Sequence, residues 1–290
     1  MVGLILAGGY GTRLRPLTRA VSKQLLPVYD KPMIYYPLST LMLMDIRKVL
    51  VITTPDFVEA MCKLLGRGAS LGMYIEYKSQ TRPAGLPDAF KIGKDFIGDD
   101  TVCLILGDNI FYGNGLIESL QDVRENMDLG CGASIFAYHV KDPQRYGVIE
   151  FGEEGQVLSL TEKPTMPKSS YAIPGLYAFD NTVAKRAEEL QPSERGELEI
   201  LDLLKSYWAE DRLCTTSLGR GIAWLDMGTP EALLQASALV QTVQERQGLM
   251  IGCLEEIAYQ KDWIDKEAVA SRARDLEGTE YGQYLLHLSD

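Results

Sequence analysis

The stretch Val2-Gly-Leu-Ile-Leu-Ala-Gly-Gly-Tyr-Gly-Thr-Arg13 begins with six largely apolar residues and continues into a glycine-rich turn. An apolar run that ends in glycines predicts a buried strand followed by a tight loop. Glycines permit positive φ and close backbone approach, so that successive N–H groups can point at a phosphate. The spacing matches neither a Walker A loop nor G-x-G-x-x-G, because Leu14 occupies the place of the last glycine. The loop is either a simple strand-to-helix turn or a phosphate cradle, and the nearby cations Arg13 and Lys23 favour the cradle.

Short apolar runs and longer amphipathic stretches alternate along the first half of the chain. The predicted strands cover residues 2–7, 49–53, 73–77, 102–106 and 133–140. The predicted helices cover residues 34–44, 56–65, 87–96 and 115–126. This alternation predicts an α/β fold with a Rossmann-like, mixed and mostly parallel sheet flanked by helices. In such sheets ligands bind at the carboxyl ends of the strands.

The pattern changes after residue 147. Val148–Phe151, the turn Gly152-Glu-Glu-Gly155 and Val157–Leu160 predict a β-hairpin insertion. Helices are predicted near 181–190 and 197–209, and Thr229-Pro230 is a typical helix start with threonine as the cap. Everything beyond this point is expected to be a helical C-terminal region. We therefore expect a core over residues 1–230 and a helical extension over 231–290, joined in one compact unit.

The composition of the 290-residue chain excludes several classes of protein. Its formal net charge of −11 does not suit a general nucleic-acid binder, which needs clustered Lys and Arg. The longest apolar segment, Met33–Leu43, is shorter than the roughly 20 residues of a membrane span, and the N-terminus lacks the pattern of a signal peptide. We expect a cytoplasmic protein that binds neither nucleic acid nor membrane.

The five cysteines and two histidines do not form a recognisable metal-binding motif. The cysteines are odd in number, widely spaced and mostly within apolar runs, which predicts reduced, buried thiols. The two histidines, His139 and His287, are expected to be structural.

Two aspartates follow apolar stretches that lie far apart in the sequence. Asp108 ends Leu104-Ile-Leu-Gly-Asp108, and Asp226 ends Trp224-Leu-Asp226. Each could be an ordinary turn residue. Together the two carboxylates permit a magnesium site, because Mg²⁺ prefers oxygen ligands and often binds substrate phosphates.

Three further segments carry polar groups where a strand or loop should end. Glu162-Lys163 is either a solvated strand end or part of a site. The acids of Arg195-Gly-Glu197-Leu-Glu199 also suit the first turn of a helix. Gln80 and Gly85 lie in a predicted loop, where a carboxamide could read the edge of a base.

In order and spacing, these motifs resemble the sugar-phosphate nucleotidylyltransferases, and among them the thymidylyltransferases that act on glucose 1-phosphate. The resemblance runs from Met1 to about Tyr284. It rests on Leu6-Ala-Gly-Gly-x-Gly-Thr-Arg-Leu14, Ser22-Lys-Gln-Leu-Leu-Pro27, Tyr29-Asp-Lys-Pro-Met33, Leu106-Gly-Asp-Asn109, Tyr146-Gly147, Glu162-Lys-Pro164, Gly196-Glu-Leu-Glu199 and Trp224-Leu-Asp226.

The resemblance implies a reaction in which glucose 1-phosphate attacks the α-phosphorus of dTTP and forms dTDP-glucose and pyrophosphate with Mg²⁺ as cofactor. It implies that the catalytic cations are Arg13, Lys23 and Lys163. The implied nucleotide-binding residues are Leu6, Gly8, Gly9, Gly11, Thr12, Arg13, Gln24, Gln80, Gly85 and Asp108. The implied sugar-phosphate-binding residues are Tyr146, Gly147, Glu162, Lys163, Tyr177 and Glu197. Asp108 and Asp226 correspond to the metal ligands.

The chain departs from the family pattern at several positions. Pro174, Leu201 and Met227 stand where the family usually has threonine, which leaves the preferred sugar phosphate open. The resemblance also implies a homotetramer with a possible regulatory nucleotide site formed by Tyr112, Gly115, Gly219, Arg220, Gly221 and Glu255. Gln260 stands where an arginine is common, so a phosphate contact of that site could be lost.

Three alternatives remain open at this level. A uridylyltransferase is one, since a single methyl contact discriminates by only about 1–3 kcal/mol. A transferase that acts on another sugar 1-phosphate is the second. The third is a nucleotide-sugar sensor without catalysis, although such a sensor would not need both metal carboxylates.

Overall fold

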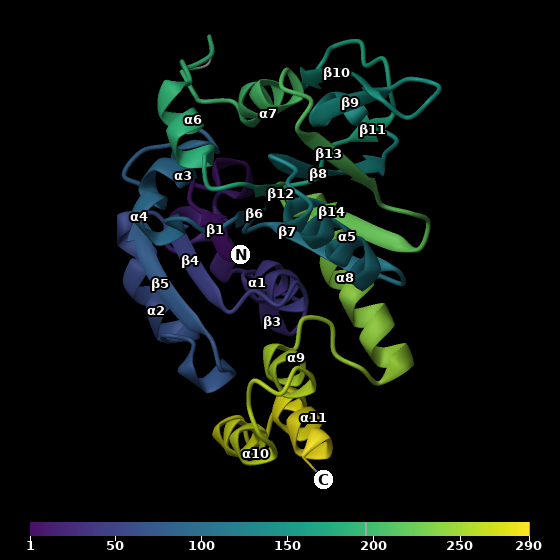
Figure 1. The fold of residues 1–290 in the computed structure, drawn as a ribbon. Coiled ribbons are helices and arrows are strands. Elements are labelled where there is room, and N and C mark those ends of the chain that lie inside the picture. The colour runs from purple at the N-terminus through teal and green to yellow at the C-terminus, as the bar shows by residue number, and fades with distance from the viewer. Residues whose placement is uncertain (195, 290) are drawn as a thin grey trace.

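The computed structural model describes residues 1–194 and 196–289. Its centre is the parallel half of a ten-stranded mixed sheet, in the order β6-β1-β4-β5 (Figure 1). These strands are β1 (Val2–Ala7), β4 (Lys48–Thr53), β5 (Tyr74–Ser79) and β6 (Val102–Leu106). All six residues of β1 are buried, as expected for a strand covered on both faces. The four predicted strands at these places are confirmed.

The other half of the sheet is mainly antiparallel and continues from β6 in the order β12-β8-β11-β9-β10, with β13 paired in parallel to β8. Its strands are β8 (Ala133–His139), β9 (Gly147–Phe151), β10 (Val157–Glu162), β11 (Tyr171–Ala172), β12 (Leu176–Phe179) and β13 (Leu213–Ser217). The antiparallel pair β9–β10 is the predicted hairpin. The mixed sheet flanked by helices is therefore confirmed.

Helices cover both faces of the sheet, and the side chains of β1 alternate between two cores. Ile5 and Ala7 contribute to the core beneath α1, α2 and α5, whereas Leu4 and Leu6 contribute to the core beneath α3, α4, α6 and α7. The first set is α1 (Tyr35–Leu43), α2 (Val58–Leu65) and α5 (Leu116–Asp128). The second set is α3 (Asp88–Ile92), α4 (Lys94–Ile97), α6 (Val183–Glu189) and α7 (Ile200–Trp208). The single helix predicted over 87–96 is interrupted at Gly93.

Two short ribbons were not predicted. One is the antiparallel pair β7 (Asn109–Gly113) and β14 (Ile222–Asp226), and the other joins β2 (Pro27–Val28) to β3 (Lys31–Pro32). Asp108 lies in the turn between β6 and β7, so a strand and not a helix follows it. The glycine-rich loop does not lead directly into an α-helix, as its interpretation as a simple strand-to-helix turn would require. Three 3₁₀ turns follow instead, at Thr12–Leu14, Leu17–Arg19 and Lys23–Leu25.

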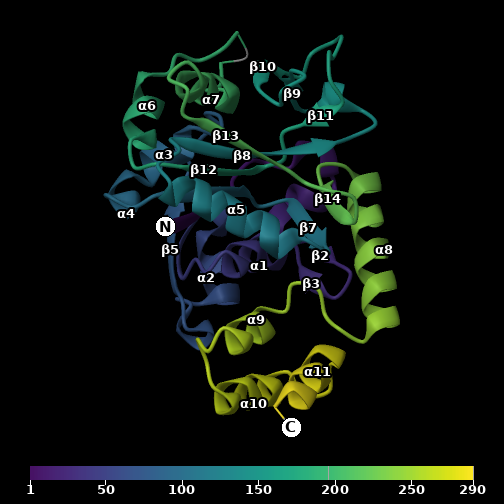
Figure 2. The same cartoon turned by 45° about the vertical axis from the view of Figure 1, so that its right-hand side comes forward.

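The C-terminal region is helical, as predicted. It comprises α8 (Pro230–Gln247), α9 (Leu254–Gln260), α10 (Lys266–Asp275) and α11 (Glu280–Leu288). The hydroxyl of Thr229 accepts a hydrogen bond from Ala232 N at 3.3 Å, which confirms the predicted cap. Helix α8 stands beside β14, while α9, α10 and α11 gather beyond α1 at the C-terminus (Figures 1 and 2).

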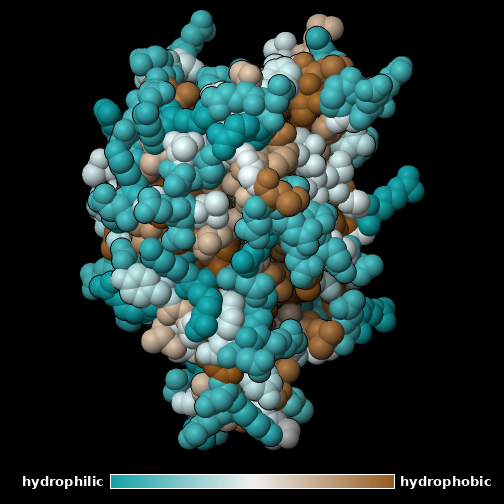
Figure 3. Space-filling model, viewed as in Figure 1, coloured by the Kyte–Doolittle hydropathy of each residue, from teal (hydrophilic) through white to brown (hydrophobic). Residues whose placement is uncertain are grey.

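The extension is packed onto the core. Ala236 and Val240 of α8 share an apolar cluster with Leu14 and Met33, and Leu254 of α9 belongs to the core that contains α1. Figure 3 shows hydrophilic side chains over most of the face in view, with apolar ones in small groups. Within the described residues, no helix is both long and apolar enough to span a membrane.

The prediction that all five cysteines are reduced, buried thiols was wrong. Cys131 and Cys214 form a disulfide, with their Cα atoms 6.2 Å apart, and both are only partly buried. Their proximity arises from the long-range pairing of β13 with β8, in which Cys214 lies opposite Ser134. The sequence separation of 83 residues hides this pairing. Cys103 and Cys253 are buried free thiols, and Cys62 is a partly buried one.

Candidate active site

The candidate site lies where the strand order of the sheet reverses. From β1 the chain leads to β4 and β5 on one side, whereas β6 pairs with β1 on the other side. A crevice at the carboxyl ends of the strands is expected at such a reversal. The glycine-rich loop leaves β1 there, and Asp108 follows the end of β6 there. Gly9 and Gly11 have φ of +96° and +54°, values that favour glycine.

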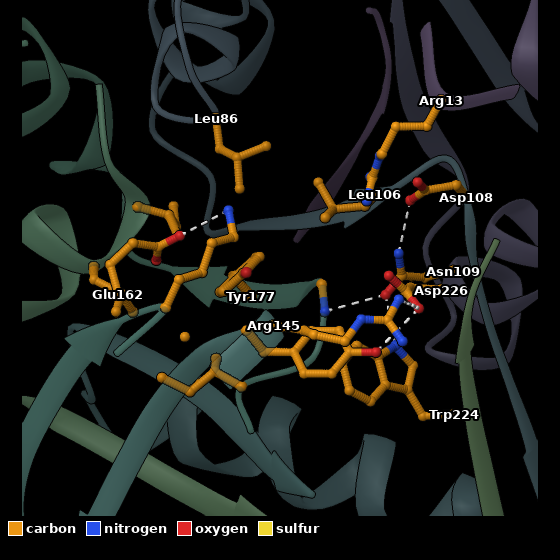
Figure 4. Close-up of a pocket in the computed structure, with 17 residues that line it drawn as sticks. Arg13, Leu86, Leu106, Asp108, Asn109, Arg145, Glu162, Tyr177, Trp224 and Asp226 are labelled. Carbon is orange, nitrogen blue, oxygen red and sulfur yellow. Dashed lines mark hydrogen bonds and ion pairs between the residues drawn. The ribbon is translucent and has the colours of Figure 1, made fainter. Parts of the chain in front are cut away.

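A continuous cleft with three compartments occupies this crevice. Two compartments have volumes of about 480 and 470 Å³, and they share Arg13, Leu86, Leu106 and Asp108. The third, of about 320 Å³, adjoins the second at Gly8 and Gly9 and contains Gln80 and Gly85. Figure 4 shows the first compartment, with Arg13 and Asp108 at one end and Glu162 at the other.

Asp108 and Asp226 come together through the β7–β14 ribbon. Asp226 lies opposite Asn109 in the register, and Met227 N donates to the carbonyl oxygen of Asp108 at 2.9 Å. The two carboxylates are close enough that Asp108 contributes to raising the pKa of Asp226. The two predicted metal ligands are therefore neighbours in space.

Asp108 is held in place from both sides. Lys23, which is largely buried, forms an ion pair with Asp108 Oδ2, and Asn109 Nδ2 donates to Oδ1 at 2.8 Å. Asn109 is itself buried and fixed, because its Oδ1 accepts from Trp224 Nε1 at 2.6 Å and from Gly175 N at 3.2 Å. This chain of hydrogen bonds fixes the carboxylate orientation before any ligand arrives.

Asp226 lies in a less polar environment. Its pKa is raised by burial, and the nearby Asp108 adds to this effect, while Arg145 opposes it. Tyr146 OH donates to Asp226 Oδ1 at 3.1 Å, and Arg145 approaches the same oxygen at 3.8 Å. Burial and the neighbouring Asp226 raise the pKa of Tyr146 to about 12. The negative charge of Asp226 is therefore only partly offset, by Arg145.

The donor set suits a hard divalent cation bound jointly by protein and substrate. Two adjacent carboxylates supply oxygen ligands, and a cation beside Asp226 would relieve the repulsion from Asp108. No cluster of three or more His, Cys, Asp or Glu that could hold a metal by itself occurs among the described residues. Mg²⁺ is typically held in this way, by one or two carboxylates plus phosphate oxygens and water.

Three cations border the cleft from different parts of the chain. The Arg13 guanidinium extends to Gly228, where an added Cβ would lie 2.8 Å from Nη2. Lys163 follows the end of β10 with an unusual φ of +40°, and its Nζ lies 3.1 Å from Glu162 Oε1. A non-glycine residue with positive φ is uncommon and often marks a functional site. Together with Lys23, these groups can neutralise a polyphosphate.

The first compartment also contains groups that suit a sugar. Tyr146, Gly147, Glu162 and Tyr177 line it, together with Arg145 and Trp224. Tyr177 is buried, which raises the pKa of its phenol, and the nearby Glu162 and Asp108 add to this effect. Carboxylate and phenol groups beside an aromatic ring are suited to hold sugar hydroxyls.

The glycine-loop side of the cleft contains the predicted base-reading residues. Gly85 has φ +96° and an isolated bridge to Leu198, and an added Cβ would lie 2.1 Å from Leu198 O. Gln80 is buried at the edge of the third compartment. Leu6 and Thr12 line the second compartment. So does Gln24, whose Oε1 accepts from Ser22 Oγ at 2.9 Å. Glu197 is exposed at the rim of both compartments, and Arg195 lies outside the described residues.

Sequence reasoning missed three residues of this cleft. Asn109 anchors Asp108, Trp224 anchors Asn109, and Arg145 approaches Asp226. The available signal was their position in the sequence: Asn109 follows Asp108, Trp224 stands two residues before Asp226, and Arg145 precedes Tyr146.

The three departures from the family pattern differ in position. Leu201 lines the first compartment and contacts the space above Gly147. Met227 is fully buried in an apolar cluster with Leu14, and Pro174 is not among the residues that line the compartment. Of the three, Leu201 is placed to affect the choice of sugar.

The residues of the predicted regulatory site divide into two groups. The β7–β14 register pairs Ile222 with Gly113, so that the turn at Gly219, Arg220 and Gly221 lies beside Tyr112 and Gly115. Glu255 belongs to a different set of contacts, because its buried carboxylate accepts from Arg272 Nε at 3.1 Å and from Tyr281 OH at 2.5 Å. Gln260 is exposed and hydrogen-bonded to Glu256.

Comparison with known proteins agrees with this geometry. The profile of the nucleotidyl transferase family matches residues 2–243. Glucose-1-phosphate thymidylyltransferases from Neisseria gonorrhoeae and Mycobacterium tuberculosis are 55% and 53% identical, each over 99% of both chains.

Solved structures show the same fold. A crystal structure described as a glucose-1-phosphate thymidylyltransferase from Bacillus anthracis with a sucrose matches with a TM-score of 0.76. It is 37% identical and covers 82% of this chain and 94% of its own. A UDP-glucose pyrophosphorylase matches with a TM-score of 0.72 at 23% identity, over 84% of this chain and all of its own, which bears on the fold alone. The chain belongs to the nucleotidyl transferase family, like the two glucose-1-phosphate thymidylyltransferases to which it is 55% and 53% identical.

Proposed function

We propose that the protein transfers a thymidylyl group from dTTP to α-D-glucose 1-phosphate. A phosphate oxygen of the sugar phosphate forms a new bond to the α-phosphorus, and the bond from that phosphorus to the β-phosphate oxygen breaks. The products are dTDP-glucose and pyrophosphate. The observation that carries the proposal is the convergence on one cleft of Asp108 and Asp226 with Arg13, Lys23 and Lys163.

The second and third compartments are assigned to the nucleotide. The backbone of Gly8, Gly9, Gly11 and Thr12 would hold the triphosphate, with Arg13 beside the departing pyrophosphate. Leu6 and Gln24 line the same space, and Lys23 would neutralise phosphate charge from its place beside Asp108. Gln80 and Gly85 would read the thymine.

The first compartment is assigned to glucose 1-phosphate. Glu162, Tyr146, Gly147 and Tyr177 would hold the sugar, and Lys163 would hold its phosphate beside the α-phosphorus. Glu197, at the rim of the second and third compartments, would reach the sugar from outside the first one. The sugar phosphate is already an anion, so the reaction requires no residue to remove a proton. The protein has to overcome the repulsion between two anions and to align them, which is typical of phosphoryl-type transfer.

Mg²⁺ is proposed as the cofactor, held by Asp108 and Asp226. When bound, it would offset the negative charge of the phosphates and of both carboxylates. The carboxylate of Asp108 is oriented by the residues around it: Lys23 and Asn109 contact it directly, and Trp224 holds Asn109.

The first experiment is to measure pyrophosphate release from dTTP or UTP with glucose 1-phosphate, galactose 1-phosphate or N-acetylglucosamine 1-phosphate. Fast release with dTTP and glucose 1-phosphate supports the proposal. Release with another sugar alone would assign specificity to the surroundings of Leu201. Nucleotide binding without release from any pair would support the sensor alternative. Asp108→Ala provides the blank.

Three further points belong to the proposal. The enzyme would act in the cytoplasm as a homotetramer and supply dTDP-glucose for deoxysugar biosynthesis, as in dTDP-rhamnose formation. A nucleotide sugar bound near Tyr112, Gly115 and Gly219–Gly221 would regulate it, and a titration of dTDP-rhamnose against the initial rate tests this. Trapping of free thiols during lysis would test the cytoplasmic location against the Cys131–Cys214 disulfide, because cytoplasmic thiols are ordinarily kept reduced.

A further inference from the structure

The amide of Gln80 has one defined orientation because of a carboxylate behind it. Gln80 Nε2 donates to Asp88 Oδ2 at 2.8 Å, and its own backbone N–H donates to Thr53 O at 2.8 Å. An aspartate carboxylate only accepts hydrogen bonds, so the NH₂ group must face it. The oxygen must therefore face the other way.

The freed oxygen points at the nucleotide side of the cleft. A Cβ added to Gly8 would lie 2.9 Å from Gln80 Oε1, which places this oxygen against the glycine-rich loop. Gln80 and Gly8 both line the third compartment. Asp88 does not line it and instead borders a separate cavity of about 480 Å³ on the other side, with Arg82 and Lys91. Asp88 would thus act on a bound base only through Gln80.

We propose that Asp88 is a positioning residue for base selection. It holds Gln80 so that an acceptor faces the base, which selects pyrimidines with an N3–H donor and rejects cytosine, whose N3 carries a lone pair. This inference rests on the proposed nucleotide site. Within that site, Asp88 decides whether Gln80 offers an acceptor or a donor to the base. A rotated amide would present NH₂ instead and would reverse the preference.

The energetic expectation follows from hydrogen-bond pairing. Opposing two acceptors leaves both without a hydrogen-bond partner, and sites that read a donor strongly reject analogues that lack it. One well-placed base contact discriminates by about 1–3 kcal/mol, which is roughly 5- to 150-fold in affinity. Loss of the fixed orientation should remove most of that factor.

The test compares the wild type with Asp88→Asn. The asparagine side chain can accept from Gln80 Nε2 or donate to Gln80 Oε1, so both orientations of the Gln80 amide become available. Asp95→Asn is the matched control, because Asp95 is also an acid in the first turn of a short helix, α4, and is exposed. Equilibrium affinities for dTTP, UTP and dCTP are measured first, and kcat and KM for pyrophosphate release second.

We expect the wild type and Asp95→Asn to prefer dTTP and UTP to dCTP. In Asp88→Asn the ratio of dTTP to dCTP affinity should lose most of that roughly 5- to 150-fold factor and approach one, and the loss should appear in KM more than in kcat. An unchanged ratio, even with a lower melting temperature, would overturn the proposal and leave Asp88 a structural residue. Equal binding of dTTP and dCTP by the wild type would overturn it too. Wild-type binding selectivity without turnover would contradict the proposed transferase activity and leave this inference intact.

Discussion

Asp226 lies directly opposite Asn109 in the antiparallel register of β14 and β7, so the carboxylate at the end of one strand is brought beside Asp108 at the start of the other. The ribbon holds the two acids where the first compartment adjoins the second, near Arg13 and Arg145. This register is the structural basis of the proposed metal site.

Replacement of Asp226 by asparagine should abolish most turnover but stabilise the protein without metal. The pKa of Asp226 is raised by burial and by Asp108, so the fold favours its protonated form. Stability from this group is therefore present at low pH and is lost as pH rises through the raised pKa. At neutral pH an uncharged amide at this position avoids the loss of stability that the buried, ionised carboxylate causes.

The check on Asp226→Asn is a thermal melt at pH 7 with EDTA, together with a rate measurement in Mg²⁺. The melting temperature should rise above that of the wild type, while kcat should fall about 10²- to 10³-fold, as for loss of one electrostatic stabiliser. A variant that melts lower in EDTA would contradict the electrostatic account of Asp226.

Replacement of Lys163 by alanine should impair the step that involves the sugar phosphate. Lys163 lines the first compartment beside Glu162, and its removal takes a cation from the proposed phosphate position. The expected loss is about 10²- to 10³-fold in kcat/KM for glucose 1-phosphate. Lys168→Ala is the control, since Lys168 is an exposed lysine on the same loop. Equal effects of both variants would remove Lys163 from the mechanism.

Replacement of Gly85 by alanine should weaken nucleotide binding, because the added Cβ forces the backbone to move. A Cβ at this position would lie 2.1 Å from Leu198 O, a contact that neither backbone can relieve without moving. We expect KM for dTTP to rise at least tenfold. Gly155→Ala is the control, because Gly155 also has positive φ but has no atom within 4 Å of an added Cβ. It should cost about 1–2 kcal/mol of stability from the strained φ and leave KM unchanged.

Asp180 should make stability depend on acid pH. Burial opposes its ionisation, but hydrogen bonds from Thr182, Tyr207 and Arg212 outweigh this effect and lower the pKa of Asp180. Arg212 Nη2 lies 2.7 Å from Oδ2. A lowered folded-state pKa contributes stability above the unfolded value of about 4 and loses it as pH falls through the lowered value.

Urea unfolding of Asp180→Asn and of the wild type measures this contribution. The variant should be less stable by about 2 kcal/mol at pH 7, in line with hydrogen bonds to charged groups, and the difference should shrink as the pH is lowered toward 3. Glu188→Gln, which breaks an exposed ion pair with Lys94, should have a much smaller effect. A difference that does not change with pH would refute the role of Asp180 ionisation.

The sequence by itself was sufficient to predict the parallel half of the sheet and the helices that cover it. β1, β4 and β6 are short apolar runs with turn residues after them, and such local signals do not depend on distant contacts. The cap at Thr229 and the hairpin of β9 and β10 are local for the same reason. The motifs also placed Gly8–Arg13, Asp108 and Lys163 at the ends of strands, where a ligand crevice is expected.

Only the tertiary structure decided which of these ends meet. The β7–β14 ribbon pairs segments separated by more than a hundred residues, so no local pattern predicts it, although it places Asp226 beside Asp108. Pairing of β13 with β8 likewise brings Cys131 to Cys214 against the expectation of free thiols. The orientation of Gln80 depends on Asp88, and that of Asp108 on Asn109 and Trp224. A residue's type determines which hydrogen bonds it can make, but the packing of distant elements determines which partner is within reach.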